Sequence, residues 1–175
     1  RDIAQKFNND YKIENFFITP EPLIKKEFSR IMSLKDGLKK MSKSEVSDLS
    51  RINLTDDKDQ IINKIKKAKT DTLPLPSKIE ELEKRPEAKN LIGIYSSLMN
   101  NTLQKSIDEF AGKNFSEFKE KLSDVVVNEI NPISLKIKEL LDDKVFLEKI
   151  LKDGYEKANE IASKKIKKIH EIVGF

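Results

Sequence analysis

Residues 29–44 read SRIMSLKDGLKKMSKS, and this stretch decides how the rest of the chain is interpreted. The short apolar run from Ser29 to Leu34 is typical of a strand. It leads into a polar segment of lysines and serines that ends in KMSKS, and a second short apolar run, RINL, follows at residues 51–54. The pattern predicts a strand that feeds an exposed loop.

The chemistry of the KMSKS loop suits a triphosphate. Lysine ammonium groups act as point charges for phosphates, while hydroxyls and backbone N–H groups fill the remaining acceptor sites. A loop that closes late in a reaction would stabilise the charge that builds on departing pyrophosphate. A lysine-rich chain also produces such a loop by chance, so the surrounding sequence must decide between the two interpretations.

Composition indicates a globular, strongly helical protein. Of the 175 residues, 37% are hydrophobic and 37% charged, which is too apolar for a disordered chain. The net charge of +4 tolerates a polyanionic partner such as RNA, but a solvated lysine-rich surface has the same charge. Without cysteine the chain has no disulfide or thiolate metal site, and its single histidine predicts no metal site. The absence of cysteine fits a reducing cytoplasm, where we expect the protein, and no apolar stretch is long enough to cross a bilayer.

Most of the chain after residue 56 has helical periodicity. Asp57 with Gln60 forms a capping box ahead of an apolar stripe, and Asn114 with Glu117 repeats the pattern. Pro132 is expected to interrupt the helix that follows Asn114. A last long helix should begin near Asp143. We expect it to bury Leu147, Ile150, Leu151, Gly154, Ala158, Ile161, Ala162, Ile166 and Ile169.

The stretch SRIMSLKDGLKKMSKS resembles the version of the class I aminoacyl-tRNA synthetase signature found in the bacterial-type tryptophanyl-tRNA synthetases. The resemblance is to the carboxy-terminal half of that family and covers nearly the full chain. It implies a mainly α fold, with a helical bundle-like tRNA-facing domain over residues 56–175. That domain would be attached to the C-terminal edge of a Rossmann-type α/β catalytic domain, represented by residues 1–55. The matching blocks are SRINLTDD, KIKKAKTDT, RPEAKNLIGIYSSL, FSEFKEKLSDVVVNEINPI and DGYEKANEIASKKIKKIHEIVGF.

The same resemblance implies a role for each loop residue. Lys40 and Lys43 would contact the ATP phosphates as the catalytic residues, with Lys43 the more important in the transition state. Met41 and Ser42 would line the nucleotide side of the loop, and Ser44 would support its turn. The implied partners are ATP with the Mg²⁺ that it carries, tryptophan and tRNA(Trp), in a homodimeric parent protein.

The implied reaction is attack of the tryptophan carboxylate on the α-phosphate of ATP, followed by transfer of the aminoacyl group to the tRNA 3′ end. The family's HIGH-like motif and tryptophan pocket are expected upstream of Arg1. We therefore expect the isolated chain to be inactive in adenylate formation.

Several charged clusters leave two interpretations open. The cluster Lys164, Lys165, Lys167 and Lys168 would either bind tRNA phosphates or form a solvated helix end. The same alternatives hold for Lys64, Lys66, Lys67 and Lys69, where the solvated face is favoured. The acidic pair Asp56 and Asp57 is expected to cap a helix. Two other functions remain: a non-catalytic tRNA-binding helical module, and a helical interaction protein that binds no nucleotide.

Overall fold

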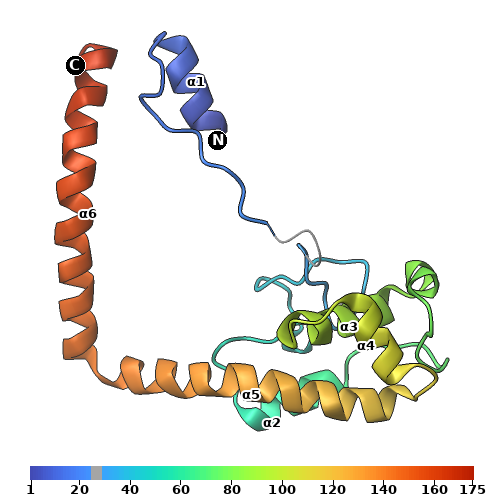
Figure 1. Ribbon diagram of the computed structural model, residues 1–175. Coiled ribbons are helices and arrows are strands. Elements are labelled where there is room, and N and C mark those ends of the chain that lie inside the picture. Colours follow the sequence, from blue (N-terminus) through green and yellow to red (C-terminus); the bar gives the residue numbers. More distant parts are fainter. Residues whose placement is uncertain (25–28) are drawn as a thin grey trace. The chain divides into compact units, whose positions relative to one another are not determined.

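The computed structural model describes residues 1–24 and 29–175, and all regular secondary structure in that part of the chain is helical (Figure 1). This confirms the mainly α prediction, while attachment to a Rossmann-type domain stays a prediction. None of the described helices is both long and apolar enough to span a membrane. In chain order the elements are α1 (Asp2–Asp10), the 3₁₀ helix η1 (Asp48–Ser50), α2 (Lys58–Lys66), the 3₁₀ helix η2 (Ile79–Lys84), α3 (Pro86–Leu98), α4 (Leu103–Phe110), α5 (Phe115–Asp142) and α6 (Lys144–Val173).

The strand predicted for residues 29–34 is wrong. In the described residues strand pairing is limited to one isolated antiparallel bridge, between Met32 and Lys40. A strand needs a neighbour along its whole length to satisfy its backbone N–H and C=O groups. In the described residues no segment pairs with residues 29–34 along their whole length. Side chains form hydrogen bonds with part of their backbone instead.

The described chain divides into two compact units. The central unit comprises residues 29–142 and holds α2 to α5; the terminal unit comprises residues 1–24 and 143–175 and holds α1 and α6. The predicted domain boundary between residues 55 and 56 lies inside the central unit and stays a prediction about the parent protein.

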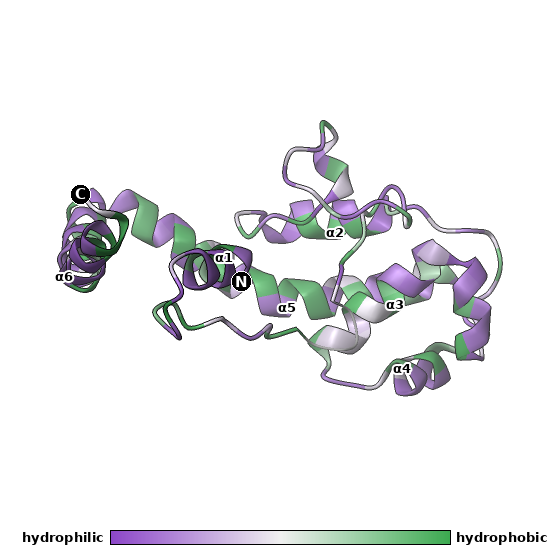
Figure 2. Ribbon diagram, turned by 90° about the horizontal axis from the view of Figure 1, so that it is seen from above, coloured by the Kyte–Doolittle hydropathy of each residue, from purple (hydrophilic) through white to green (hydrophobic). Residues whose placement is uncertain are grey.

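The core of the central unit forms where α5 packs against α2 and α3. Figure 2 shows hydrophobic residues (green) along all three helices. Tyr95, Phe110 and Phe118 meet edge to face in this core, with ring centroids 4.9–5.9 Å apart. The capping box of Asp57 and Gln60 forms at the start of α2 as predicted. This unit therefore provides a rigid platform for the loop at residues 40–44.

Pro132 does not interrupt α5, contrary to the prediction. The helix is continuous over 28 residues with Pro132 inside it. Proline removes one helical hydrogen bond, which leaves the carbonyl of Asn128 without its usual donor. Both residues are exposed, so water can hydrate that carbonyl, and the packing of the flanking turns offsets the remaining cost, which for an interior proline is about 3 kcal/mol.

The terminal unit begins its long helix where the sequence predicts but does not bury it. Asp143 caps α6, accepting a hydrogen bond of 3.0 Å from the backbone N–H of Phe146. No residue of α6 is buried among the described residues, so the predicted burial of its apolar face is wrong within this chain. Tyr155, in the same helix, is 66% exposed. The other described segments of this unit, residues 1–24, are too short to cover a 30-residue helix.

Tyr95 gives the core a feature that titration can detect. Burial and a 2.9 Å hydrogen bond donated to Glu109 raise the pKa of Tyr95 to about 12. Because the folded pKa lies above the ordinary value of 10.0, this contribution to stability is complete below pH 10 and is lost as pH rises towards 12.

We expect a spectrophotometric titration of the folded chain to show one tyrosine that ionises near pH 12, and Tyr95→Phe to remove that phase. The free energy of unfolding should also fall less steeply above pH 10 in the variant. Identical titration curves for the two proteins would contradict the buried position of this hydroxyl.

Candidate functional site

The KMSKS segment, residues 40–44, begins on the returning arm of a hairpin-like turn formed by residues 31–41. Two backbone hydrogen bonds, of 2.7 and 3.0 Å, close this turn across the bridge between Met32 and Lys40. Lys40 therefore lies on a paired segment, whereas Lys43 lies beyond it.

The Asn90 side chain, on α3, bonds the backbone groups of Met32 that a neighbouring strand would otherwise bond. Its side-chain oxygen accepts from the Met32 N–H at 2.9 Å, and its side-chain NH₂ donates to the Met32 carbonyl at 2.9 Å. Asn90 is only 3% exposed, so water does not compete strongly for these bonds. The pair ties the entry of the loop to the helical core.

Leu34 joins the entry of the loop to its exit and to the segment that follows α2. Its N–H donates to the carbonyl of Ser50 at 2.8 Å, and its carbonyl accepts from the N–H of Lys69 at 2.7 Å. Leu34 and Ser50 are both buried. The two ends of the segment from residue 34 to residue 50 are therefore fixed to each other.

Gly37 packs directly against the first turn of α3. A Cβ atom at this position would lie 2.6 Å from backbone atoms of Pro86 and Glu87, so only glycine fits. The Lys69 ammonium, 2.9 Å from the Glu87 carboxylate, holds the pKa of that carboxyl below its ordinary value, against the effect of burial. The turn is thus fixed by shape as well as by hydrogen bonds.

Lys43 lies at the centre of a small turn made by the two loop serines. The hydroxyls of Ser42 and Ser44 are 2.9 Å apart, and the Ser44 N–H donates to the Ser42 hydroxyl at 3.4 Å. Lys40 and Lys43 are exposed, and neither forms an ion pair with any residue that the structure describes. Met41 packs against the hydrophobic core. The binding of phosphate by these residues stays a prediction.

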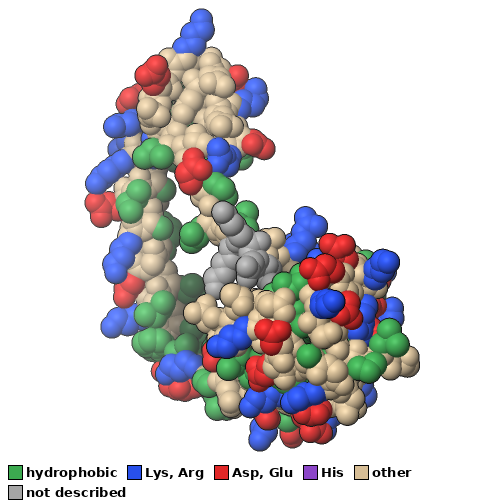
Figure 3. All heavy atoms as spheres, turned by 45° about the vertical axis from the view of Figure 1, so that its right-hand side comes forward, with side chains coloured by type: hydrophobic (Ala, Val, Ile, Leu, Met, Phe, Trp, Pro, Cys, Tyr) green, Lys and Arg blue, Asp and Glu red, His purple; other side chains and the backbone are tan. Residues whose placement is uncertain are grey.

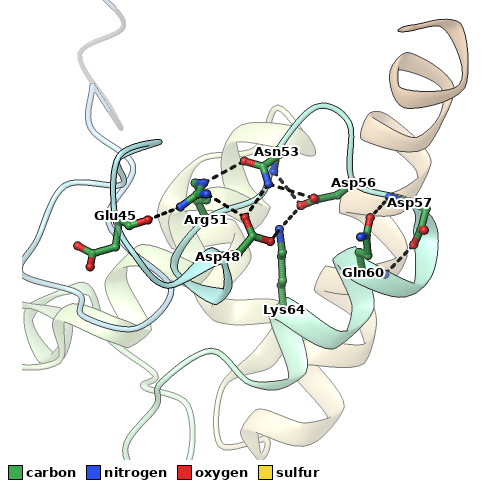
Figure 4. Close-up of polar contacts among 8 residues, drawn as sticks. All are labelled: Glu45, Asp48, Arg51, Asn53, Asp56, Asp57, Gln60 and Lys64. Atoms are coloured by element: carbon green, nitrogen blue, oxygen red, sulfur yellow. Dashed lines mark hydrogen bonds and ion pairs between the residues drawn. The ribbon is translucent and has the colours of Figure 1, made fainter. Parts of the chain in front are cut away.

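A charged array that the sequence did not predict lies at the exit of the loop (Figure 4). The Lys64 ammonium is 2.6 Å from Asp48 and 2.6 Å from Asp56. The side chains of Lys64 and Asp56 are 4% and 5% exposed. Lys64 is therefore neither on a solvated face nor free for RNA, which corrects the prediction for it. Asp56 pairs with Lys64 instead of capping a helix, while Asp57 does cap one.

Arg51 extends this array to the loop itself. Its guanidinium donates to the carbonyl of Glu45 at 2.9 Å, to the side chain of Asn53 at 3.0 Å, and pairs with Asp48 at 3.0 Å. The Lys64 ammonium and the Asn53 amide hold the pKa of Asp48 below its ordinary value. The array thus links the residue after KMSKS to helix α2.

The four lysines near the end of α6 differ in what they contact. Lys165 donates to the carbonyl of Phe16 and lies 3.6 Å from the centre of that residue's ring. Lys164 forms an exposed ion pair of 2.9 Å with a glutamate one turn earlier. Lys167 and Lys168 are exposed and form no ion pair within the described chain. Lys167 and Lys168 could therefore bind a polyanion without first giving up a contact within the described chain.

Comparison with known proteins places this loop in a family. The family model for tRNA synthetases class I (W and Y) matches residues 1–131, a range that includes the KMSKS loop and its anchors. The chain belongs to this synthetase family. Over its full length it is 45% identical to a tryptophan–tRNA ligase of Brucella melitensis and 47% identical to that of Caulobacter vibrioides.

The synthetase relatives are longer than this chain, which spans about half their length, 54% and 51% of the two ligases. A solved tryptophanyl-tRNA synthetase from Mycoplasma pneumoniae matches all of the chain with a TM-score of 0.81 at 24% identity, and the match covers 51% of that structure. This likeness shows that the fold is shared. The resemblance inferred from the sequence is confirmed.

Proposed function

We propose that the protein containing this chain is a tryptophan–tRNA ligase, to which the chain contributes the loop that binds the ATP phosphates and a helical tRNA-facing region. The proposal rests on where Lys40 and Lys43 lie. Both ammonium groups are exposed, on a loop whose backbone is fixed on each side, in a chain whose relatives include tryptophan–tRNA ligases.

In the proposed reaction, a carboxylate oxygen of tryptophan attacks the α-phosphorus of ATP, which enters with Mg²⁺ as part of the substrate. The bond from the α-phosphorus to the bridging oxygen breaks, and pyrophosphate leaves with the bonding electrons. Lys40 and Lys43 stabilise the charge on the leaving group, and a fixed loop backbone lowers the reorganisation that this requires. A tRNA 3′-terminal hydroxyl then displaces AMP from the adenylate.

Tryptophan-dependent exchange of labelled pyrophosphate into ATP tests the proposed function in the full-length protein. We expect exchange with tryptophan and not with tyrosine, and no exchange by this chain alone. Exchange that depends on tyrosine would identify a different specificity. Absence of exchange with either amino acid, together with tight tRNA binding, would favour the non-catalytic tRNA-binding module.

A tRNA-facing role for α6 rests on Lys167 and Lys168. Figure 3 shows Lys and Arg side chains interspersed with Asp and Glu over the visible face, so the overall charge does not single out an RNA surface. The two lysines carry the proposal because they are exposed on successive positions and form no ion pair in the described residues.

We expect tRNA binding by this chain to be only weakly specific for tRNA(Trp) and to fall steeply as salt rises, since each phosphate contact contributes a logarithmic salt slope of roughly 0.7 to 0.9. Replacing Lys167 and Lys168 with alanine should weaken binding and reduce that slope by up to about 2. Lys149→Ala with Lys152→Ala on the same helix is the matched control. Equal affinities and slopes for the two double variants would assign the cluster to a solvated helix end.

A further inference from the structure

We propose that Arg51 is a positioning residue that fixes the carboxyl end of the KMSKS loop, and through it Lys43, to helix α2. The inference rests on the proposed function of the loop and extends it to a residue outside the signature. Arg51 does not itself reach the phosphates in this proposal; it determines where the loop that carries Lys43 is held.

The first step of the argument is the geometry of the guanidinium. Arg51 is the donor to the Glu45 carbonyl, which belongs to the residue directly after Ser44. Figure 4 shows Arg51 lying between Glu45 on one side and Asp48 on the other. The Arg51 side chain is only 17% exposed, while its partners Glu45 and Asp48 lie at the surface. A planar group with several donors in fixed directions is suited to holding a carbonyl and a carboxylate at once.

The second step is the support behind Arg51. Asp48 is shared between Arg51 and Lys64, and Lys64 also pairs with buried Asp56. Two cations and two carboxylates balance within this array, so no net charge is left in it. Lys64 belongs to α2, which packs against the core. Arg51 is therefore connected to the buried Lys64–Asp56 pair through Asp48, whose own side chain is 55% exposed.

The third step is the length of chain left free. At the other end of the loop, the Met41 N–H donates to the carbonyl of Ile31 at 3.0 Å, and its side chain packs against the core. With Glu45 held as well, three residues, 42–44, lie between two fixed points, and Lys43 is the middle one. Without the Arg51 contact the free segment would extend to the start of η1 at Asp48. A longer free segment has more conformations to lose when the loop orders around phosphate.

We expect Arg51→Ala in the full-length protein to lower kcat for tryptophan-dependent pyrophosphate exchange about ten-fold, as the loss of one charged hydrogen bond would. The KM for tryptophan should stay within about two-fold, because the change affects an interaction completed in the transition state. Arg51→Lys should recover only part of the rate, since an ammonium cannot match the fixed donor directions of a guanidinium.

Arg85→Ala is the matched control for loss of a structural arginine. Arg85 is 11% exposed, pairs with Asp71 at 2.7 Å and donates to the carbonyl of Pro74 at 2.8 Å, and in the described residues it forms no hydrogen bond or ion pair with residues 40–44. It should lower the melting temperature as much as Arg51→Ala does but leave kcat within about two-fold. A loss of kcat in Arg85→Ala equal to that in Arg51→Ala would overturn the inference.

A double-mutant cycle separates the inference from the function on which it rests. If Arg51 acts through Lys43, Arg51→Ala should lower exchange by less than about two-fold in a Lys43→Ala background. Fully additive losses would overturn the inference and leave the phosphate-binding loop in place. Full exchange activity in Lys43→Ala itself would overturn the proposed function. Trypsin cleavage after Lys43 supplies a second measurement: it should be faster in Arg51→Ala than in Arg85→Ala, and equal rates would contradict the positioning role.

Discussion

Lys43→Ala in the full-length protein is expected to lower the rate of tryptophan-dependent pyrophosphate exchange by roughly ten- to a hundred-fold. The substitution removes an ammonium that meets phosphate charge as pyrophosphate departs, and a charged hydrogen bond contributes about 1.5 to 3 kcal/mol. The structure favours a sizeable effect because the Lys43 side chain is exposed on a turn whose backbone is fixed by its neighbours.

The loss should appear in the chemical step. An interaction that forms late lowers the rate constant when it is removed, with little change in the affinity for tryptophan in the ground state. Lys40→Ala should change the rate in the same direction. Lys39→Ala is the control, because Lys39 precedes the signature and already faces Asp36 at 3.9 Å. Unchanged exchange in Lys43→Ala with a collapse of tryptophan binding would mean that the loop does not hold phosphate.

Helix starts were predictable because capping is local. The side chains of Asp57 and Gln60 satisfy backbone groups within the same turn, so four consecutive residues contain the whole signal. Asp143 caps α6 by the same short-range geometry. Neither start depends on what the helix later packs against, and both were found from the sequence.

Features that depend on a distant neighbour were mispredicted. Residues 29–34 have the composition of a strand, but strand formation needs a partner, and Asn90, 58 positions from Met32, takes that place. Whether Pro132 breaks its helix depends on its surroundings, and at this exposed position water can hydrate the freed carbonyl while the flanking turns keep the helix continuous. The burial of α6 was inferred from its period alone, which shows that a face is apolar but not what covers it.

The residues of the candidate site also fall into two groups, those that the sequence indicates and those that only the structure brings together. The five residues of KMSKS could be proposed from the sequence because they are adjacent, and their role stays a prediction. The Asn90, Gly37 and Arg51 anchors are visible only in three dimensions. One signal could have revealed the array at the loop exit. Lys64 falls at the third position after Ile61 and directly before Ile65, within the apolar stripe of α2, and a lysine on a buried face requires a carboxylate partner.

Lys64→Ala is accordingly expected to lower the free energy of unfolding by about 3 to 5 kcal/mol, since removing one partner of a buried ion pair leaves the other charge uncompensated. The charge left behind is that of Asp56, which keeps its hydrogen bonds from Asn53 at 2.8 and 3.1 Å but loses its only cation in the described structure.

Denaturant unfolding of the chain measures this effect, and Lys66→Ala is its control. Lys66 lies two positions further along the same helix and is exposed, so its loss should change stability by no more than about 0.5 kcal/mol. Adding Asp56→Asn to Lys64→Ala should restore part of the stability, because the second substitution removes the unpaired charge and keeps the shape of the side chain. Equal stability of Lys64→Ala and Lys66→Ala would show that the Lys64–Asp56 ion pair is not buried in solution. The support that we infer for Arg51 from this pair would then also be wrong.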